Sequence, residues 1–442
     1  MVSLSQSAIV ILGASGDLTK RKLMPALDAL YTQGKICQSC IIVGTGRSFF
    51  TDQSFRDRFD VSPGFKENLF YHQHTEGLRE FLLSKGEFEK IVFFLSQPPE
   101  AYGASARELH AEGFRQEASL VIEKPFGYDF LSARKLDLKL TSYFSESQIF
   151  RIDHYLAKEP VQNILVFRFA NPAFHPVWNS RYIQSIQINA LESNGIIERG
   201  AYFDHAGIIR DMVQNHLIQL LSLLTMDAPA TLSAEDIRVQ KIAVLKTMKI
   251  EKCYRYQYEG YRYEHDVNPS STTETFAEIQ LSINNLQWAG TPVFIRSGKS
   301  VHRRGTEIGV VFKPLPNILF NKDGNLKPNQ IIFKIQPAEG IILDINTKTP
   351  GSGDELADTH MNFCYRDSFK DEIPEAYQRL LYDALRGDHT LFVSGAETEA
   401  AWALFDSVLD KGDITEYPRG QLPQSKLNVS WIDFDKYSHF CV

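Results

Sequence analysis

The segment between residues 8 and 30 constrains the fold more than any other part of the chain. Residues 8–12 are apolar, residues 13–19 form the turn Gly-Ala-Ser-Gly-Asp-Leu-Thr, and apolar residues then recur at positions 23, 24, 27 and 30. A strand, a glycine turn and a helix in this order open a dinucleotide-binding βαβ unit. Glycines let the backbone approach a pyrophosphate, and the helix N-terminus offers it free N–H groups. The turn departs from the GxGxxG pattern, so a βα turn without a ligand is the alternative.

The second predicted strand, residues 40–43, is followed by Gly44, Thr45, Gly46 and Arg47. An NAD-binding fold usually carries an acid here, which accepts a hydrogen bond from the ribose 2′-hydroxyl, whereas an arginine accommodates a 2′-phosphate. Arg47 therefore favours NADP as the cofactor. The alternative is a solvated arginine in a glycine loop.

Two continuous apolar runs, residues 91–95 and 119–122, are typical of buried parallel strands. The second run leads into Glu123, Lys124 and Pro125. A residue before proline is kept out of the α region, so Lys124 is expected in an extended conformation at a strand end. Ligands bind at that edge of an open α/β sheet, which makes Lys124 a candidate binding residue. A plain turn lysine is the alternative.

The chain of 442 residues is long enough for two domains. We place the boundary near residue 150: residues 1–150 are predicted to form an α/β Rossmann-type domain, and residues 151–442 an α+β domain with a large, mostly antiparallel sheet. Alternating residues predict strands at 167–171, 185–190, 276–283, 307–312, 331–335 and 341–345. Apolar residues at helical spacing predict one long helix over 204–225, and further helices are predicted at 129–147, 375–385 and 397–409.

Residues 151–158, Arg-Ile-Asp-His-Tyr-Leu-Ala-Lys, concentrate charged and polar groups at the predicted boundary. If a helix begins near Asp153, then His154 and Lys158 are four residues apart and share one face. Two cationic donors side by side suit a phosphate, and Asp153, turned away from them, suits the orientation of another group. A surface helix start with solvated charges is the alternative.

His216 lies on the apolar stripe of the predicted helix 204–225, and a histidine in such a stripe is usually a core residue. The same helix carries unusually many polar side chains, which a helix that only packs does not need. Another predicted strand ends in Gly298 and Lys299, with Arg304 five residues further on. A solvated basic hairpin is the alternative there.

The formal net charge of −7 argues against a general binder of nucleic acid or of a membrane surface. The N-terminal apolar run is too short for a signal or a membrane span, so we expect a cytoplasmic protein. Five cysteines fit reduced thiols better than a disulfide framework. Cys37 and Cys40 form a CxxC pair without a second such pair, and we predict no metal site.

Five segments, taken together, resemble the glucose-6-phosphate dehydrogenase family: residues 13–22, 123–127, 151–159, 200–219 and 295–299. They occur in family order. The resemblance implies oxidation of glucose 6-phosphate at C1 to 6-phospho-D-glucono-1,5-lactone with hydride transfer to NADP, the first step of the oxidative pentose phosphate pathway. It also implies a homodimer through the large sheet, and a cis peptide bond between Lys124 and Pro125 is plausible.

The resemblance also implies roles for individual residues. His216 matches the general base, and Asp153 matches the acid that orients it. The substrate phosphate would contact His154, Tyr155 and Lys158. The sugar hydroxyls would meet Lys124, Glu192, Asp211 and Lys299, and Arg304 matches a further cation of that site. The implied NADP contacts are Gly13, Ala14, Ser15, Gly16, Asp17, Leu18, Arg47, Tyr102 and Lys124.

The chain is shorter than most members of the family, mainly between Arg47 and Ile91 and after residue 410. The tail, residues 429–442, is rich in aromatic residues and has no counterpart that we can align. This end argues against the second, structural NADP that animal members carry. Two rival functions stay open: another NADP-linked sugar dehydrogenase that needs no phosphate site, and a catalytically silent NADP-binding partner.

Overall fold

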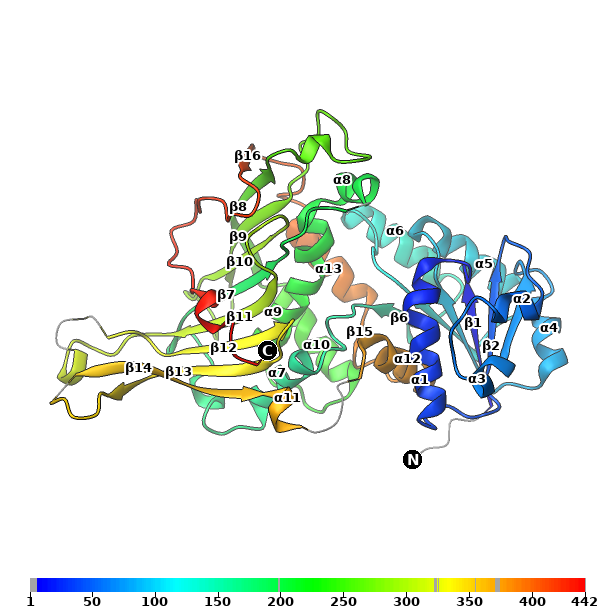
Figure 1. Ribbon diagram of the computed structural model, residues 1–442, viewed down its shortest axis with the longest axis horizontal. Coiled ribbons are helices and arrows are strands. Elements are labelled where there is room, and N and C mark those ends of the chain that lie inside the picture. The colour runs from blue at the N-terminus through cyan, green and yellow to red at the C-terminus, as the bar shows by residue number, and fades with distance from the viewer. Residues whose placement is uncertain are drawn as a thin grey trace. The chain divides into compact units, whose positions relative to one another are not determined.

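The structure is a computed structural model that describes residues 6–197, 199–321, 324, 326–353, 355–369 and 374–441. The chain divides into two compact units, and each is described here by itself (Figure 1). The first unit comprises Met1–Lys158, Pro229–Val239 and Ile373–Trp402, and the second comprises Glu159–Ala228, Gln240–Glu372 and Ala403–Val442. Two segments from beyond residue 158 thus belong to the first unit, while the functional boundary near residue 150 stays a prediction.

The first unit is built on a seven-stranded sheet with the order β15-β6-β5-β4-β1-β2-β3. The bounds are β1 Ser7–Leu12, β2 Ile41–Gly46, β3 Leu69–Gln73, β4 Lys90–Leu95, β5 Ala118–Ile122, β6 Ile149–Ile152 and β15 Phe392–Val393. Strands β1 to β6 pair in parallel, and β15 pairs antiparallel with β6. The strand order reverses between β1 and β4, and ligands of doubly wound sheets bind at such a reversal.

Both faces of this sheet are covered, which explains the continuous apolar runs. Ile9 and Ile11 face a core that includes side chains of α1 (Met24–Thr32) and α12 (Ala376–Arg386). Ala8, Val10 and Leu12 face the opposite core, to which α4 (Leu78–Lys85), α5 (Tyr102–Ala111) and α6 (Phe130–Thr141) contribute. Helix α12 lies beside α1 although more than three hundred residues separate them (Figure 1).

The second unit contains a nine-stranded sheet with the order β14-β13-β12-β11-β7-β10-β9-β8-β16. The bounds are β7 Ile183–Leu191, β8 Met248–Tyr258, β9 Phe276–Ile283, β10 Val293–Gly298, β11 Gly305–Phe312, β12 Gln330–Gln336, β13 Gly340–Lys348, β14 Leu356–Cys364 and β16 Ile414–Tyr417. Among the described strand pairs of this sheet, only β7–β10 and β8–β16 are parallel. The predicted fold class is confirmed, as are the predicted strands at 185–190, 276–283, 307–312, 331–335 and 341–345.

The predicted strand at 167–171 is wrong, because these residues lie at and beyond the end of helix α7 (Glu159–Phe169). The buried side chain of Arg168 donates to the carbonyl oxygens of Leu223 and Met226, both at 2.6 Å. These carbonyls lie at the end of α9 (Ile218–Thr225), where a helix lacks its own hydrogen-bond donors. A tertiary contact therefore overrides the local alternating pattern.

The predicted helix 204–225 is three consecutive segments: α8 (Gly200–Ile208), the π-helix η5 (Ile209–Leu217) and α9. The kink falls at Gly207, whose φ of +67° favours glycine. After the kink, Glu274 accepts a hydrogen bond from the backbone N–H of Ile209 at 3.2 Å and thereby caps η5. The remaining predicted helices occur as α6, α12 and α13 (Gly395–Phe405), each with shifted ends.

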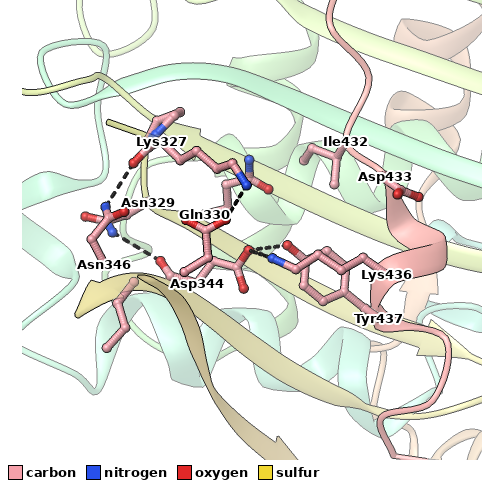
Figure 2. A pocket seen from close by; sticks show the side chains of 12 residues that line it. Lys327, Asn329, Gln330, Asp344, Asn346, Ile432, Asp433, Lys436 and Tyr437 are labelled. Carbon is pink, nitrogen blue, oxygen red and sulfur yellow. Dashed lines mark hydrogen bonds and ion pairs between the residues drawn. The ribbon is translucent and has the colours of Figure 1, made fainter. Parts of the chain in front are cut away.

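The C-terminal segment packs on β11, β12 and β13. Ile432, Phe434 and Tyr437 form a core with Val311, Ile332 and Ile342. Lys436 and Tyr437 both reach the carboxylate of Asp344 on β13, beside a cavity of about 140 Å³ (Figure 2). The aromatic tail thus covers an apolar patch of the sheet.

Cys364, the last residue of β14, forms a disulfide with Cys441. The prediction that all the cysteines are reduced is therefore wrong. The sequence separation of 77 residues concealed the pair. None of the helices in the described residues combines the length and apolar character that crossing a bilayer requires.

Loss of the disulfide is expected to loosen the tail. Cys441→Ser should lower the free energy of unfolding by about 2–4 kcal/mol, because the open chain gains conformational freedom when unfolded. Thermal unfolding of both proteins measures this change, with Cys37→Ser as the control at a free thiol. Alkylation of the denatured wild type should label only Cys37, Cys40 and Cys253 until a reductant is added. Labelling of Cys441 without reductant would contradict the pairing.

Candidate active site

The glycine turn after β1 is held at the ends of two neighbouring strands. The backbone N–H groups of Gly13 and Ala14 both donate to the carbonyl oxygen of Thr45, at 2.8 and 3.1 Å. Gly13 has a φ of +84°, and a Cβ atom there would lie 2.2 Å from the carbonyl oxygen of Ser96, just after β4. Only glycine fits this position. The turn is consequently fixed at the ends of β1 and β4, where the strand order reverses.

Arg47 directly follows β2 and is exposed. Its own carbonyl oxygen accepts a hydrogen bond from the Gln73 side chain at 3.0 Å, and the hydroxyl of Tyr71 donates to the carbonyl oxygen of Ser48. The ring of Tyr71 packs edge-on against Phe50 at a centroid distance of 5.1 Å. A braced loop therefore presents the Arg47 guanidinium to solvent beside the end of β2.

Lys124 follows β5 and is joined to Pro125 by a cis peptide bond, as the sequence suggested. The hydroxyl of Tyr102 donates to the carbonyl oxygen of Glu123 at 3.0 Å. Tyr102 is only 1% exposed, so it supports this strand end from the core. Its predicted contact with the cofactor stays a prediction.

Glu123 is a functional candidate that the sequence did not indicate. Its carboxylate accepts a hydrogen bond from the hydroxyl of Tyr377 on α12, at 2.8 Å. Removal from water raises the pKa of Glu123 to about 7, and the negative charge of Asp153 adds to the shift. The Tyr377 hydrogen bond and the positive charge of Lys124 oppose it. A carboxyl group that titrates near neutral pH thus adjoins Lys124 and Asp153. Tyr377 lies far away in the sequence, so no local pattern signalled the pair.

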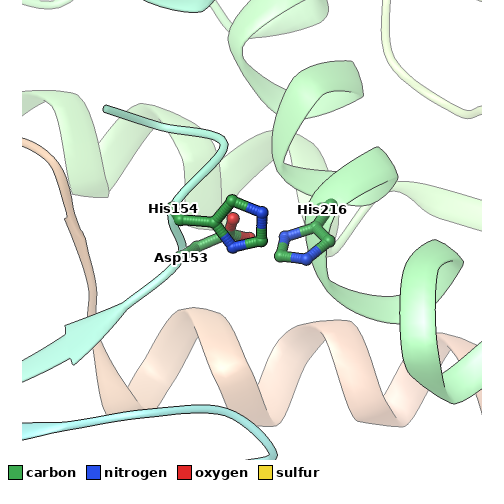
Figure 3. Close-up of side chains that lie close together, drawn as sticks. All are labelled: Asp153, His154 and His216. Carbon is green, nitrogen blue, oxygen red and sulfur yellow. The ribbon is translucent and has the colours of Figure 1, made fainter. Parts of the chain in front are cut away.

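Residues 153–158 form successive turns, and the predicted helix start at Asp153 is wrong. The carboxylate of Asp153 accepts from the backbone N–H of Tyr155 at 3.0 Å, and its carbonyl oxygen accepts from Leu156 at 3.0 Å. This side-chain bond competes with helical pairing, and the helix begins only at Glu159, one residue before a proline. Asp153 and His154 are drawn in Figure 3 on this segment after β6.

The turn still groups the residues predicted to hold phosphate. The rings of His154 and Tyr155 lie 5.1 Å apart between centroids, and the ammonium of Lys158 lies 5.6 Å from the centroid of the Tyr155 ring. The predicted helical i, i+4 relation between His154 and Lys158 does not exist. Their proximity to Tyr155 arises from the turn.

In the second unit, Glu192 and Lys299 follow the C-terminal ends of the parallel neighbours β7 and β10. The parallel register brings both ends to one edge, where the ammonium of Lys299 lies 2.5 Å from the Glu192 carboxylate. The same ammonium lies 3.8 Å from the carboxylate of Asp211. Three predicted sugar-binding residues thus form one cluster of charged groups.

Asp211 and His216 both lie on η5, and Figure 3 shows His216 on this helix. A π-helix forms i→i+5 hydrogen bonds, so residues five apart are about one turn apart and share a face. In an α-helix the same two residues would diverge by more than a quarter turn. Both are buried, with His216 1% exposed. The π-helix therefore places His216 on the side of the helix that carries Asp211.

Arg304 is exposed in the loop between β10 and β11. Its neighbour Arg303 pairs instead with Glu307 and with Asp435 of the C-terminal segment. Of the two arginines, Arg304 is the one whose side chain faces solvent.

Comparisons with known proteins agree with this architecture. The model "Glucose-6-phosphate dehydrogenase, NAD binding domain" matches residues 10–163, and "Glucose-6-phosphate dehydrogenase, C-terminal domain" matches residues 165–431. The chain belongs to the glucose-6-phosphate dehydrogenase family. The predicted family is confirmed, and the protein is an oxidoreductase by family.

Individual relatives support the assignment. The chain is 39% identical to glucose-6-phosphate 1-dehydrogenase of Chlamydia muridarum, over 91% of this chain and 90% of that protein. It is 39% identical to the chloroplastic enzyme of Nicotiana tabacum, over 93% of this chain and 78% of that protein. A solved glucose-6-phosphate dehydrogenase in complex with its substrate superimposes with a TM-score of 0.90 at 34% identity, covering 96% of this chain and 97% of that one.

The raised pKa of Glu123 predicts a pH-dependent stability. Between pH 4.5, its ordinary pKa, and about 7, the folded protein keeps a proton that the unfolded chain releases. The free energy of unfolding of the wild type should therefore fall relative to that of Glu123→Gln as the pH rises through this window. Above about pH 7 the difference between the two free energies should stay constant. Thermal unfolding of both proteins from pH 4 to 8 measures the effect.

Tyr377→Phe provides the matched control for that experiment. It removes the hydrogen bond that favours the ionised carboxylate, so the upper end of the window should move to higher pH. Parallel stability curves for wild type and Glu123→Gln would show that Glu123 does not retain its proton in the folded protein.

Proposed function

We propose that the protein oxidises the C1 hydroxyl of glucose 6-phosphate to 6-phospho-D-glucono-1,5-lactone, with NADP as the hydride acceptor. Membership of the family, over nearly the whole chain, is the observation that carries this proposal. The glycine turn and the Glu192–Lys299–Asp211 cluster support it, because they supply a nucleotide-binding edge and a set of hydroxyl-binding groups.

In this proposal His216 is the general base. A neutral imidazole has one ring nitrogen with a free lone pair, which can accept the proton of the C1 hydroxyl. Removal of that proton builds negative charge on the C1 oxygen as the hydride leaves. We assign Asp153 to orient the imidazole and to stabilise the imidazolium that forms. Asp153 is 3% exposed and His216 is 1% exposed. Charged groups that are removed from water interact more strongly than exposed ones.

His154, Tyr155 and Lys158 are assigned to the substrate phosphate. A cation and two further donors on a short turn match a dianionic group, because hydrogen bonds to charged oxygens are the strong ones. Lys124, Glu192, Asp211, Lys299 and Arg304 are assigned to the sugar. Carboxylates accept from hydroxyl groups and ammonium groups donate to them, so the paired Glu192 and Lys299 can orient a polyhydroxylated ring.

The residues of the first unit fit a dinucleotide. Gly13 to Leu18 would hold the pyrophosphate at a turn too close to Ser96 for any side chain at position 13, and Arg47 would hold the 2′-phosphate. Lys124 and Tyr102 are assigned to the nicotinamide half. When bound, NADP supplies the hydride acceptor, and the protein supplies position and charge. Residues 1–150 are accordingly the proposed cofactor domain, and residues 151–442 the substrate and dimerisation domain.

Two further assignments follow the family expectation. We propose a homodimer formed through the nine-stranded sheet, and a cytoplasmic location. Size-exclusion chromatography with light scattering tests the first, and fractionation of the source cells tests the second.

The phosphate site predicts strong discrimination against free glucose. Charge-assisted hydrogen bonds each contribute about 1.5–3 kcal/mol, so two of them favour the phosphorylated substrate in kcat/KM by roughly 10²–10⁴. Lys158→Met should reduce this ratio by about tenfold or more, whereas Lys135→Met on the exposed side of α6 should leave it unchanged. Equal kcat/KM for both sugars would favour an enzyme of unphosphorylated sugars.

Replacement of the proposed base tests the chemistry. His216→Asn should lower kcat by roughly 10²–10⁴ with little change in KM, because the base acts in the transition state. His205→Asn, at an exposed position of α8, should retain the wild-type rate. A wild type that binds NADP but reduces none with substrate would instead support the catalytically silent partner.

A further inference from the structure

Arg58 connects the two segments that are assigned to the cofactor, although no sequence motif singled it out. It lies just beyond α2 (Asp52–Arg56), in the first unit. Its Nη2 donates to the carbonyl oxygen of Ser15 in the glycine turn, at 2.9 Å. Its guanidinium carbon also lies 4.8 Å from the centroid of the Phe50 ring, in the loop that begins with Arg47. One side chain therefore touches the turn and the loop at the same time.

The positive charge of Arg58 also acts on Tyr71, which supports this loop. Burial raises the pKa of the Tyr71 hydroxyl, and the positive charge of Arg58 opposes that rise. The Tyr71 hydroxyl donates to the carbonyl oxygen of Ser48, the residue after Arg47. The guanidinium of Arg58 is thus near the backbone on which Arg47 is mounted.

The guanidinium of Arg58 retains donors for a ligand. It has five N–H groups, and Ser15 is its only hydrogen-bond partner among the residues that the structure describes. The neighbouring acids are engaged elsewhere: Asp52 accepts from the backbone N–H of Tyr71 and Asp57 from the Gln53 side chain. Within the described residues neither carboxylate is paired with Arg58, so the positive charge of Arg58 adds to that of Arg47 at this loop.

We propose that Arg58 is a second cation for the 2′-phosphate of NADP and, together with Arg47, determines the preference for NADP over NAD. The bond to Ser15 and the stacking on Phe50 fix its guanidinium beside the turn that is assigned to the pyrophosphate. A 2′-phosphate next to Arg47 would then accept from two guanidinium groups. The inference rests on the proposed cofactor site, since it adds a residue to that site.

The experiment compares kcat/KM for NADP and for NAD in four variants. Arg58→Met should lower kcat/KM for NADP by roughly tenfold to a hundredfold, with a change of less than about threefold for NAD. Arg58→Lys, which keeps the charge but not the planar fork, should give an intermediate loss. Arg47→Ala should show the same selectivity for NADP and tests the proposed cofactor site on its own.

Arg56→Met is the matched control. Arg56 also donates to backbone carbonyl oxygens, those of Glu67 and Leu69, and its guanidinium lies 5.4 Å from the centroid of the Phe70 ring. It makes the same kinds of structural contact two residues away, without touching the glycine turn. Its loss should affect NADP and NAD equally.

Direct binding of adenosine 2′,5′-bisphosphate and of 5′-AMP, measured by isothermal titration calorimetry, gives a second readout that does not require turnover. Loss of Arg58 should weaken binding of the bisphosphate but not binding of 5′-AMP.

Equal losses of kcat/KM for NADP and for NAD in Arg58→Met would show that Arg58 only stabilises the glycine turn, and this result would overturn the inference. Unchanged values of kcat/KM would overturn it as well. If Arg47→Ala is also unselective, then the proposed cofactor site itself is wrong. If Arg58→Met does not fold, the same comparison of kcat/KM for NADP and for NAD is made with Arg58→Lys.

Discussion

The first unit depends on the carbonyl oxygen of Thr45, which accepts two backbone N–H groups from the glycine turn. These bonds anchor the turn to the end of β2, while the close approach of Gly13 to Ser96 sets its distance from the end of β4. The position of the turn is thus defined from both sides by backbone atoms, which side-chain changes on the surface do not move. The proposed cofactor ligands Arg47, Arg58 and Lys124 are positioned relative to this turn.

In the second unit, polar side chains are brought together by the strand arrangement and by a π-helix. Two strands of a mostly antiparallel sheet are parallel neighbours, and their shared edge brings Glu192 and Lys299 together. The π-helix η5 then places Asp211 within 3.8 Å of the same ammonium. A local change of helical geometry and one parallel strand pair are sufficient to collect residues that are more than one hundred positions apart.

Local patterns predicted most of the fold. Runs of apolar residues predicted β1, β2, β4 and β5 of the first sheet but not β3, and alternation predicted five of the six strands named for the second unit. The failures have physical causes. Arg168 binds carbonyls at the end of α9 and keeps residues 167–169 helical, and the side chain of Asp153 forms a turn where a helix start was expected. The partners of Glu123, Arg58 and Cys364 are distant in sequence or carry no pattern, so only the three-dimensional structure reveals them.

The late segment that holds α12 and β15 has a consequence for how this architecture can be divided. Leu380, Leu381 and Ala384 fill the core beside α1, and Phe392 and Val393 pair with the edge of β6. A fragment ending near residue 158 would leave that core open to water and that strand edge unpaired, which is the condition for self-association. The nucleotide-binding half is therefore not a contiguous segment that can be transferred on its own. A chimaera with another dehydrogenase that is joined at residue 158 would also need residues 373–402 from this chain.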